Sequence, residues 1–194
     1  MKIFWAIFIF CIMSSSSLAS IGQITKADGP SKITRETGIV DGTLNTDILS
    51  MDRIETFKDS QKIDFIDETK LELTPHSRVV IDEFIFDPNQ NLGALSIKAS
   101  LGTVRYASGQ IAKKYKQNVK IKTPTAVIGV RGTDFAMTVD ETGSSLIVLL
   151  PSCDGDGYCF VGEIEVETDA GFVIMNQAFQ TTLITTSESK PLKP

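Results

Sequence analysis

The chain has 194 residues, of which 19 are basic and 24 are acidic, so its formal net charge is −5. This length holds one domain or two small ones, and 42% hydrophobic with 22% charged residues is ordinary for a globular protein. An acidic chain argues against nucleic acid as a partner, because phosphate binding requires a clustered basic face. Lys113, Lys114 and Lys116 do cluster, but a solvated loop or an edge strand accounts for them.

The N-terminus has the pattern of a secretory signal peptide. Lys2 precedes an apolar run over residues 3–13, and small residues at Ser17 and Ala19 match the −3 and −1 positions of a cleavage site. We expect residues 1–19 to be removed and the mature chain to be exported, either to the periplasm or out of the cell. The alternative, an uncleaved anchor, is disfavoured because the run is shorter than the roughly 20 residues that span a bilayer. No membrane span is expected after cleavage.

The remaining chain predicts strand after strand. Apolar residues alternate with polar ones in "KIDFID", "KLELT" and "SRVVID". The alternation puts the two apolar residues of each segment on the same face of its strand: Ile63 and Phe65, Leu71 and Leu73, and Val79 and Ile81. Turn-prone pieces such as "TPHS" and "DPNQN" separate the strands, and further strands follow as far as "GFVIM". The pattern predicts an all-β fold of short strands, arranged either as an irregular β-solenoid-like roll or as a β-sandwich. We assign this domain to residues 20–187 and expect residues 188–194 to form a disordered tail.

One apolar strand carries an arginine between two glycines, in "TPTAVIGVRGTDF". Both of its faces hold apolar residues, so we expect it to be covered on both sides. Glycine inside a strand marks a bulge or bend, which predicts that Arg131 is partly buried at a corner and bonded to Asp134 or to freed carbonyls. The alternative is an arginine presented to an anionic ligand. The residues assigned to this structural motif are Thr123, Pro124, Thr125, Gly129, Val130, Arg131, Gly132, Thr133, Asp134 and Phe135.

Two cysteines, Cys153 and Cys159, flank the turn-forming "DGDGY". In an exported chain this spacing predicts a small disulfide loop. A calcium loop is the alternative, but Glu163 comes too early for the twelve-residue pattern. A metal site is not expected, because the single histidine, His76, is far off in sequence.

Catalysis is not predicted. His76 sits in a turn, no phosphate-binding glycine loop precedes a helix, and no cofactor is expected. A pair of carboxylates could serve a hydrolase in principle, but charged residues on the solvent face of a sheet account for them better. The carboxylates considered are Asp64, Asp67, Asp82, Glu83 and Asp87.

The arginine motif resembles the signature of the FecR-type periplasmic domain. "MDRIET", "KIDFIDETKLELTPHSRVVIDEF", "GTVRYASGQIAKK" and "GEIEVETDAGFVIMNQAFQ" resemble further segments of that family, so the resemblance covers most of residues 21–185. Met51 and Phe179 stand where the family usually has glycine.

The resemblance implies an all-β domain outside the cytoplasm with no established catalytic residues. In the best-known members it follows a membrane helix and a cytoplasmic anti-sigma segment, which we do not find in this chain. We therefore expect a non-catalytic binding or scaffold module of the cell envelope that recognises a protein or an envelope glycan. The alternatives are a periplasmic component of a signalling system that works with a separate membrane sensor and, more weakly, a carboxylate-dependent hydrolase.

Overall fold

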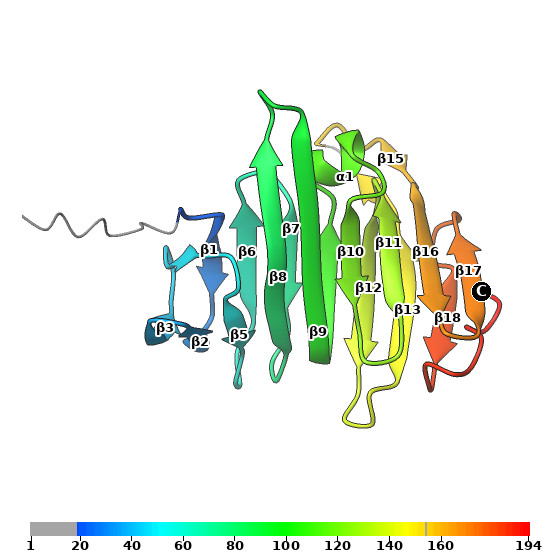
Figure 1. Ribbon diagram of the computed structural model, residues 1–194, viewed down its shortest axis with the longest axis horizontal. Helices are drawn as coiled ribbons and strands as arrows, with labels where there is room; N and C mark the ends of the chain where they lie inside the picture. The colour runs from blue at the N-terminus through cyan, green and yellow to red at the C-terminus, as the bar shows by residue number, and fades with distance from the viewer. Residues whose placement is uncertain (1–18, 154) are drawn as a thin grey trace, which may run out of the picture.

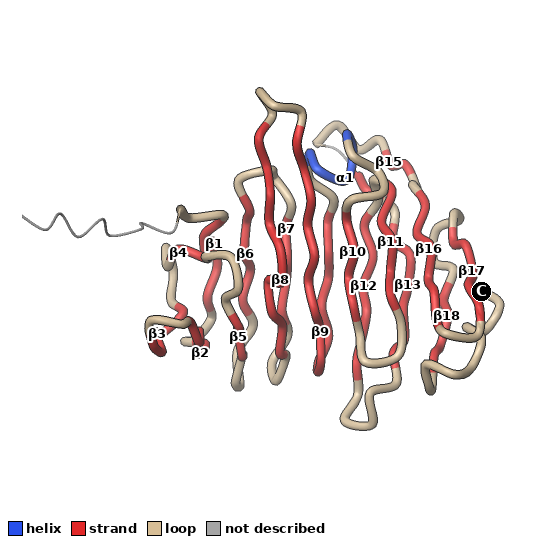
Figure 2. The backbone as a smooth tube through the Cα atoms, viewed as in Figure 1, coloured by secondary structure: helices blue, strands red, loops and turns tan. Residues whose placement is uncertain are grey.

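A computed structural model describes residues 19–153 and 155–194 as two face-to-face layers of strands. The predicted signal peptide lies outside these residues, apart from Ala19. In Figure 1 the chain advances along the long axis of the molecule, from β1 at one end to β17 and β18 at the other. The tube in Figure 2 is almost entirely strand and loop, with one short helix.

Layer A and layer B share one long strand, β9 (Leu92–Ala107), whose first part pairs in layer B and whose second part pairs in layer A. The other strands of layer A are β1 (Gly22–Ala27), β4 (Asp47–Ile48), β6 (Gln61–Phe65), β7 (Lys70–Leu73), β12 (Asp134–Val139), β13 (Ser145–Leu150) and β18 (Thr181–Ile184). The other strands of layer B are β2 (Ser31–Arg35), β3 (Gly38–Gly42), β5 (Arg53–Glu55), β8 (Arg78–Asp87), β10 (Val119–Lys122), β11 (Val127–Arg131), β16 (Glu163–Thr168) and β17 (Gly171–Met175).

The chain alternates between the layers as it advances. After β9 crosses from layer B into layer A, the short helix α1 (Gln110–Lys114) returns the chain to β10, which lies parallel to β9. The other neighbouring strands of the described residues are antiparallel, some of them as hairpins, such as β6 with β7, β12 with β13 and β16 with β17. The all-β prediction is confirmed, and the architecture combines both predicted forms: two packed layers, as in a sandwich, built by a coiling chain, as in a solenoid.

The core lies between the layers and follows from the alternation in the sequence. Each predicted inward pair, Ile63 with Phe65, Leu71 with Leu73 and Val79 with Ile81, is buried. Tyr106 and Phe135 are the largest fully buried side chains, and their ring centroids are 5.3 Å apart. Because outward residues take the opposite parity, charged side chains collect on the outer faces of both layers.

Two residues that stand where the resembling family usually has glycine adopt a left-handed backbone conformation. Met51 has φ 68° and Phe179 has φ 66°, the region where an L-residue is strained and glycine is not. The backbone N–H of each bonds a carbonyl of a neighbouring strand, Ile81 and Leu149 respectively. These contacts hold the turns in the conformation that glycine would adopt freely.

An ion pair with a buried carboxylate lies at the end of the molecule near β2. The guanidinium of Arg35 donates to Asp52 through Nε, at 2.8 Å, and through Nη2, at 3.0 Å. The backbone N–H of Leu49 donates to the same carboxylate, whose side chain is 1% exposed. Neither residue stands out in the local sequence pattern, so this pair is not predictable from sequence.

The last residues differ from the disordered tail expected at 188–194. Leu192 donates its N–H to Leu183 and accepts from the hydroxyl of Thr182. The hydroxyl of Thr168 donates to the carbonyl of Ser189, and Pro191 is buried. Backbone groups of this segment are therefore bonded to both layers at the end formed by β17 and β18.

Candidate functional site

The arginine motif, residues 123–135, carries the chain from layer B to layer A. β11 ends at Arg131, Gly132 turns the chain with φ 69°, and β12 begins at Asp134. A positive φ at the corner favours glycine, and the predicted bend is found at Gly132. Gly129 lies in regular strand opposite Glu165 and takes no part in the bend.

The Thr-Pro-Thr segment before β11 ties the two layers together through hydroxyl groups. Thr125 Oγ1 lies 2.8 Å from Ser145 Oγ at the start of β13, and Ser145 Oγ donates to Thr123 Oγ1 at 2.8 Å. Thr125 Oγ1 also donates to the carbonyl of Gly143. The Pro124 ring lies 3.2 Å from the position that a Cβ on Gly143 would take. The polar groups of this segment are thus used inside the fold.

Arg131 has other partners than the sequence predicted. Its guanidinium pairs with Glu163 and, at 3.3 Å, with Glu165, both on the neighbouring strand β16. The arginine side chain is 37% exposed and the glutamates 31% and 34%. Two expectations are therefore wrong: Asp134 is not the partner, and β11 is covered on one face only. Ile128 and Val130 point into the core, while the open outer face of layer B holds Arg131.

Beyond the corner the motif packs against the segment that leads into α1. Ser108 Oγ donates to the carbonyl of Thr133 at 2.6 Å and accepts from its N–H at 2.9 Å. Asp134 Oδ1 accepts from the N–H of Ser108 and from Ser152 Oγ. Phe135 lies in the core beside Tyr106. Burial raises the pKa of Tyr106, because the phenolate would lie away from water.

The predicted disulfide is present between Cys153 and Cys159. It closes a two-stranded hairpin, β14 (Ser152–Cys153) with β15 (Cys159–Phe160), which forms a separate small sheet. The hairpin is tied to the body by the 2.6 Å hydrogen bond from Ser152 to Asp134. Phe160 is 53% exposed.

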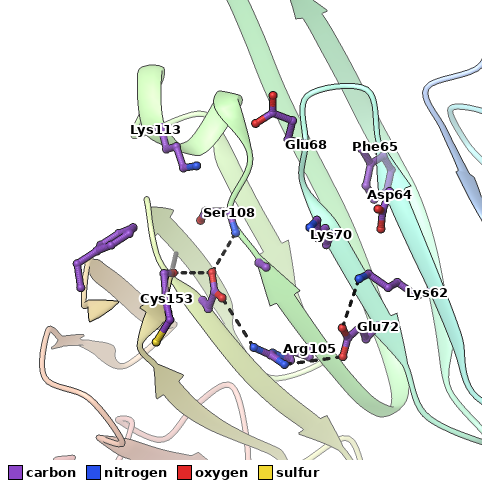
Figure 3. Close-up of a pocket in the computed structure, with 14 residues that line it drawn as sticks. Lys62, Asp64, Phe65, Glu68, Lys70, Glu72, Arg105, Ser108, Lys113 and Cys153 are labelled. Atoms are coloured by element: carbon purple, nitrogen blue, oxygen red, sulfur yellow. Dashed lines mark hydrogen bonds and ion pairs between the residues drawn. The ribbon is translucent and has the colours of Figure 1, made fainter. Parts of the chain in front are cut away.

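A groove of about 660 Å³ lies on the outer face of layer A, between this hairpin and strands β6 and β7 (Figure 3). Of the predicted motif and disulfide residues, Asp134 and Cys153 reach it. Lys113 of the noted lysine cluster and Asp64 of the carboxylates also line it. His76 lies at the turn between β7 and β8 and is not part of it.

The floor of the groove is a ladder of opposite charges on four neighbouring strands. Lys62 on β6 faces Glu72 on β7, and Glu72 faces Arg105 on β9, with nitrogen–oxygen distances of 4.0 and 3.9 Å. Arg105 in turn lies 3.9 Å from Asp134 on β12. The dashed lines of Figure 3 trace this ladder. Because opposite charges alternate across it, the floor carries no net charge.

Two lysines of the groove have no ion pair among residues 19–153 and 155–194. They are Lys70 on β7 and Lys113 on α1. Two carboxylates stand with them: Glu68 accepts from the side chain of Gln110, and Asp64 has a buried oxygen, Oδ1, with no hydrogen-bond partner in the described part of the chain. Of these four groups, Lys70 and Lys113 are the ones that the described part of the chain leaves without a charged partner, since Glu68 is bonded to Gln110 and the Oδ1 atom of Asp64 is buried.

Sequence reasoning missed the groove because it joins residues from distant segments. Alternation places Lys62, Lys70 and Glu72 on a solvent face, and that signal is present in the sequence. It does not reveal that β9 and β12 continue the same face, which follows from the register Glu72 to Arg105 and Arg105 to Ala136.

The described part of the chain holds no group of three or more His, Cys, Asp and Glu side chains that could bind a metal ion. No helix within those residues is long and apolar enough to span a membrane.

The profile of the family described as FecR protein matches residues 52–150, about half of the chain. The chain therefore belongs to the FecR protein family, whose members are regulatory proteins associated with the cell envelope. The match begins at the buried Asp52, contains the whole arginine motif and ends just before the disulfide hairpin. A search among curated proteins finds no match.

Proposed function

We propose that this protein is an exported, non-catalytic binding module of the cell envelope and that the groove on layer A is its recognition site. The observation that carries the proposal is the contrast within the groove. Its floor charges are neutralised by one another, whereas Lys70 and Lys113 are left without ion pairs. Charged groups that a fold does not use for its own stability are candidates for contacts with a partner.

The arrangement supports binding better than hydrolysis. A carboxylate pair that acts as acid and base needs two groups of opposite protonation facing one substrate. Here Glu72 and Asp134 lie on either side of Arg105, each 3.9 Å from its guanidinium, so the two carboxylates do not face a common substrate position. Tyr106 on β9 is fully buried and burial raises its pKa, so its hydroxyl is a poor nucleophile.

An envelope capture experiment tests this function. The full chain, recovered after export, is immobilised and exposed to an envelope extract of the source organism, with bound proteins and glycans identified. A variant carrying Lys70→Gln and Lys113→Gln should lose the specific partner, whereas Lys120→Gln on layer B should keep it. N-terminal sequencing of the same material should give Ser20 as the first residue. A partner retained by the double variant would exclude the groove, and an intact Met1 would exclude signal cleavage.

The second candidate is a regulatory component that works with a separate membrane sensor. Membership of the FecR family favours it. It differs from the first candidate in the identity of the captured partner, which would be a membrane protein that depends on the same groove residues.

A further inference from the structure

We propose that the free edge of β17 pairs antiparallel with β17 of a second copy of this chain, so that layer B continues from one molecule into the next. The inference goes beyond the proposed function, because it concerns a sheet edge at one end of the molecule and not the groove (Figure 1). Three observations carry it: the unpaired main chain of this edge, its lack of charge, and side chains that match those of a second copy.

β17 is the last strand of layer B and has one neighbour. Residues Gly171–Met175 pair with β16, and no other strand of the described residues pairs with them. The C-terminal segment that closes this end bonds to β18 and to Thr168 and Asp169 before β17. It makes no main-chain bond to residues 172–175 within the described part of the chain. An unpaired strand edge presents N–H and C=O groups that can bind another strand.

The edge of β17 lacks the features that keep the other free edges apart from a second copy. In the large sheet, the other described strands with a single neighbour are β3, β4 and β18. β3 contains Asp41, β4 begins at Asp47, and Leu192 donates its N–H to Leu183 on β18. Charged residues on an edge strand oppose pairing between copies. β17, with the sequence "GFVIM", presents no charge to a second copy of a chain whose net charge is −5.

The side chains of β17 fit a two-fold antiparallel pairing centred on Val173, which packs against the core. In this register Phe172 of each copy lies opposite Ile174 of the other. Both side chains are on the outer face of layer B, where they are 61% and 42% exposed. An aromatic residue directly opposite a β-branched one stabilises an antiparallel pair. The pairing therefore covers the two large apolar side chains that β17 leaves in water.

The acidic strand next to β17 does not oppose this pairing. The outer face of β16 carries Glu163, Glu165 and Glu167, and the first two are paired with Arg131. In the joined sheet the β16 strands of the two copies are separated by both β17 strands. At the usual strand spacing they lie about 14 Å apart. This exceeds the Debye length of roughly 8 Å at physiological ionic strength, so repulsion between them is largely screened.

The pairing determines how two copies present their grooves. Two strands that run antiparallel in one sheet are related by a two-fold axis perpendicular to that sheet. Layer A of both copies therefore lies on the same side of the joined layer B, and both grooves open toward that side. A partner with two matching sites then gains avidity by engaging both grooves. This consequence, unlike the pairing itself, rests on the proposed function.

Sedimentation equilibrium of the full exported chain over a series of concentrations tests the pairing. We expect a reversible shift from the mass of one chain to the mass of two as the concentration rises. Phe172→Glu with Ile174→Glu places like charges opposite each other and should weaken dimerisation at least tenfold. Phe172→Lys with Ile174→Glu places opposite charges there and should restore it. Ile39→Glu, at an exposed position of the edge strand β3, is the control and should dimerise like the parent.

Each outcome supports or overturns the inference. A parent chain that stays monomeric at every concentration would overturn the pairing. A dimer that keeps its affinity in the Phe172→Glu, Ile174→Glu variant would show that it forms through another surface. Failure of the Phe172→Lys, Ile174→Glu variant to dimerise, with an unfolding temperature like that of the parent, would overturn the register centred on Val173. The capture experiment with the Lys70 and Lys113 variant is separate, so either proposal can fail without the other.

Discussion

The arginine motif and the groove differ in how the fold uses their residues. In the motif, Gly132 sets the corner, Thr125 is bonded to Ser145, and Arg131 is paired with two glutamates. In the groove, Lys70 and Lys113 project from β7 and α1 without ion pairs in the described chain. The more conspicuous stretch of sequence is thus the one the architecture explains, and the less conspicuous one is the better candidate for function.

This contrast makes a general expectation about substitutions. Positions that the fold determines should lose stability when changed, and positions that it leaves free should keep stability and lose binding.

The largest loss is expected at Asp52, the extreme case of a fold-determined charge. Asp52→Ala removes the carboxylate partner of the partly buried Arg35 and leaves the N–H of Leu49 without its acceptor. Breaking a buried pair from one side costs roughly 3–5 kcal/mol. Denaturant unfolding measures this, with Asp41→Ala as an exposed control. A loss below about 1 kcal/mol would mean that the pair is not a structural requirement.

Gly162→Ala should come next, because Gly162 packs against the corner of the motif. A Cβ there would lie 2.9 Å from the carbonyl oxygen of Arg131 and closer still to that of Gly132. Overpacking of this kind costs about 1–3 kcal/mol. Gly155→Ala is the matched control, since no atom lies within 4 Å of its added carbon. Equal stability of the two variants would show that the corner tolerates a shift of the backbone.

Met51→Gly should stabilise the protein, whereas the two substitutions above should destabilise it. The fold dictates a left-handed residue at position 51, and the chain places there a methionine that is 58% exposed. Glycine removes this backbone strain, but it also gives the unfolded chain more conformational freedom, which offsets part of the gain. The net increase in the free energy of unfolding is expected to be up to about 1 kcal/mol. Thermal unfolding is compared with Met51→Ala, which keeps the strain. If glycine destabilises more than alanine, the left-handed backbone is not the factor that limits this site.

Arg131→Ala should have a modest effect, because its ion pairs are about one third exposed and screened by water. The expected loss of unfolding free energy is about 0.2–1 kcal/mol. Chemical denaturation of Arg131→Ala and Arg131→Gln measures it. A loss of 3 kcal/mol would restore the buried network that the sequence suggested.

Sequence alone predicts the all-β class, the inward pairs of β6, β7 and β8, the disulfide and the FecR family. These succeed because they depend on local alternation, on cysteine spacing, or on a continuous motif. It fails for the partners of Arg131, because cross-strand register brings Glu163 opposite that residue from 32 positions away. It fails for Arg35 and Asp52 in the same way, since neither residue type is unusual in its local pattern. Predicting the groove requires knowing that β6, β7, β9 and β12 are neighbours in this order, and this order is a property of the folded topology.

The most direct test of the account measures stability and binding on one variant, Lys70→Gln with Lys113→Gln. Both lysines lie outside the internal bonding of the fold, so the free energy of unfolding should stay within about 0.5 kcal/mol of the parent. The same protein should lose its partner in the envelope capture experiment, while Lys120→Gln keeps it. A stability loss above about 1 kcal/mol would contradict the claim that these two lysines do not stabilise the fold. Capture equal to that of the parent chain would contradict the claim that the groove is the recognition site.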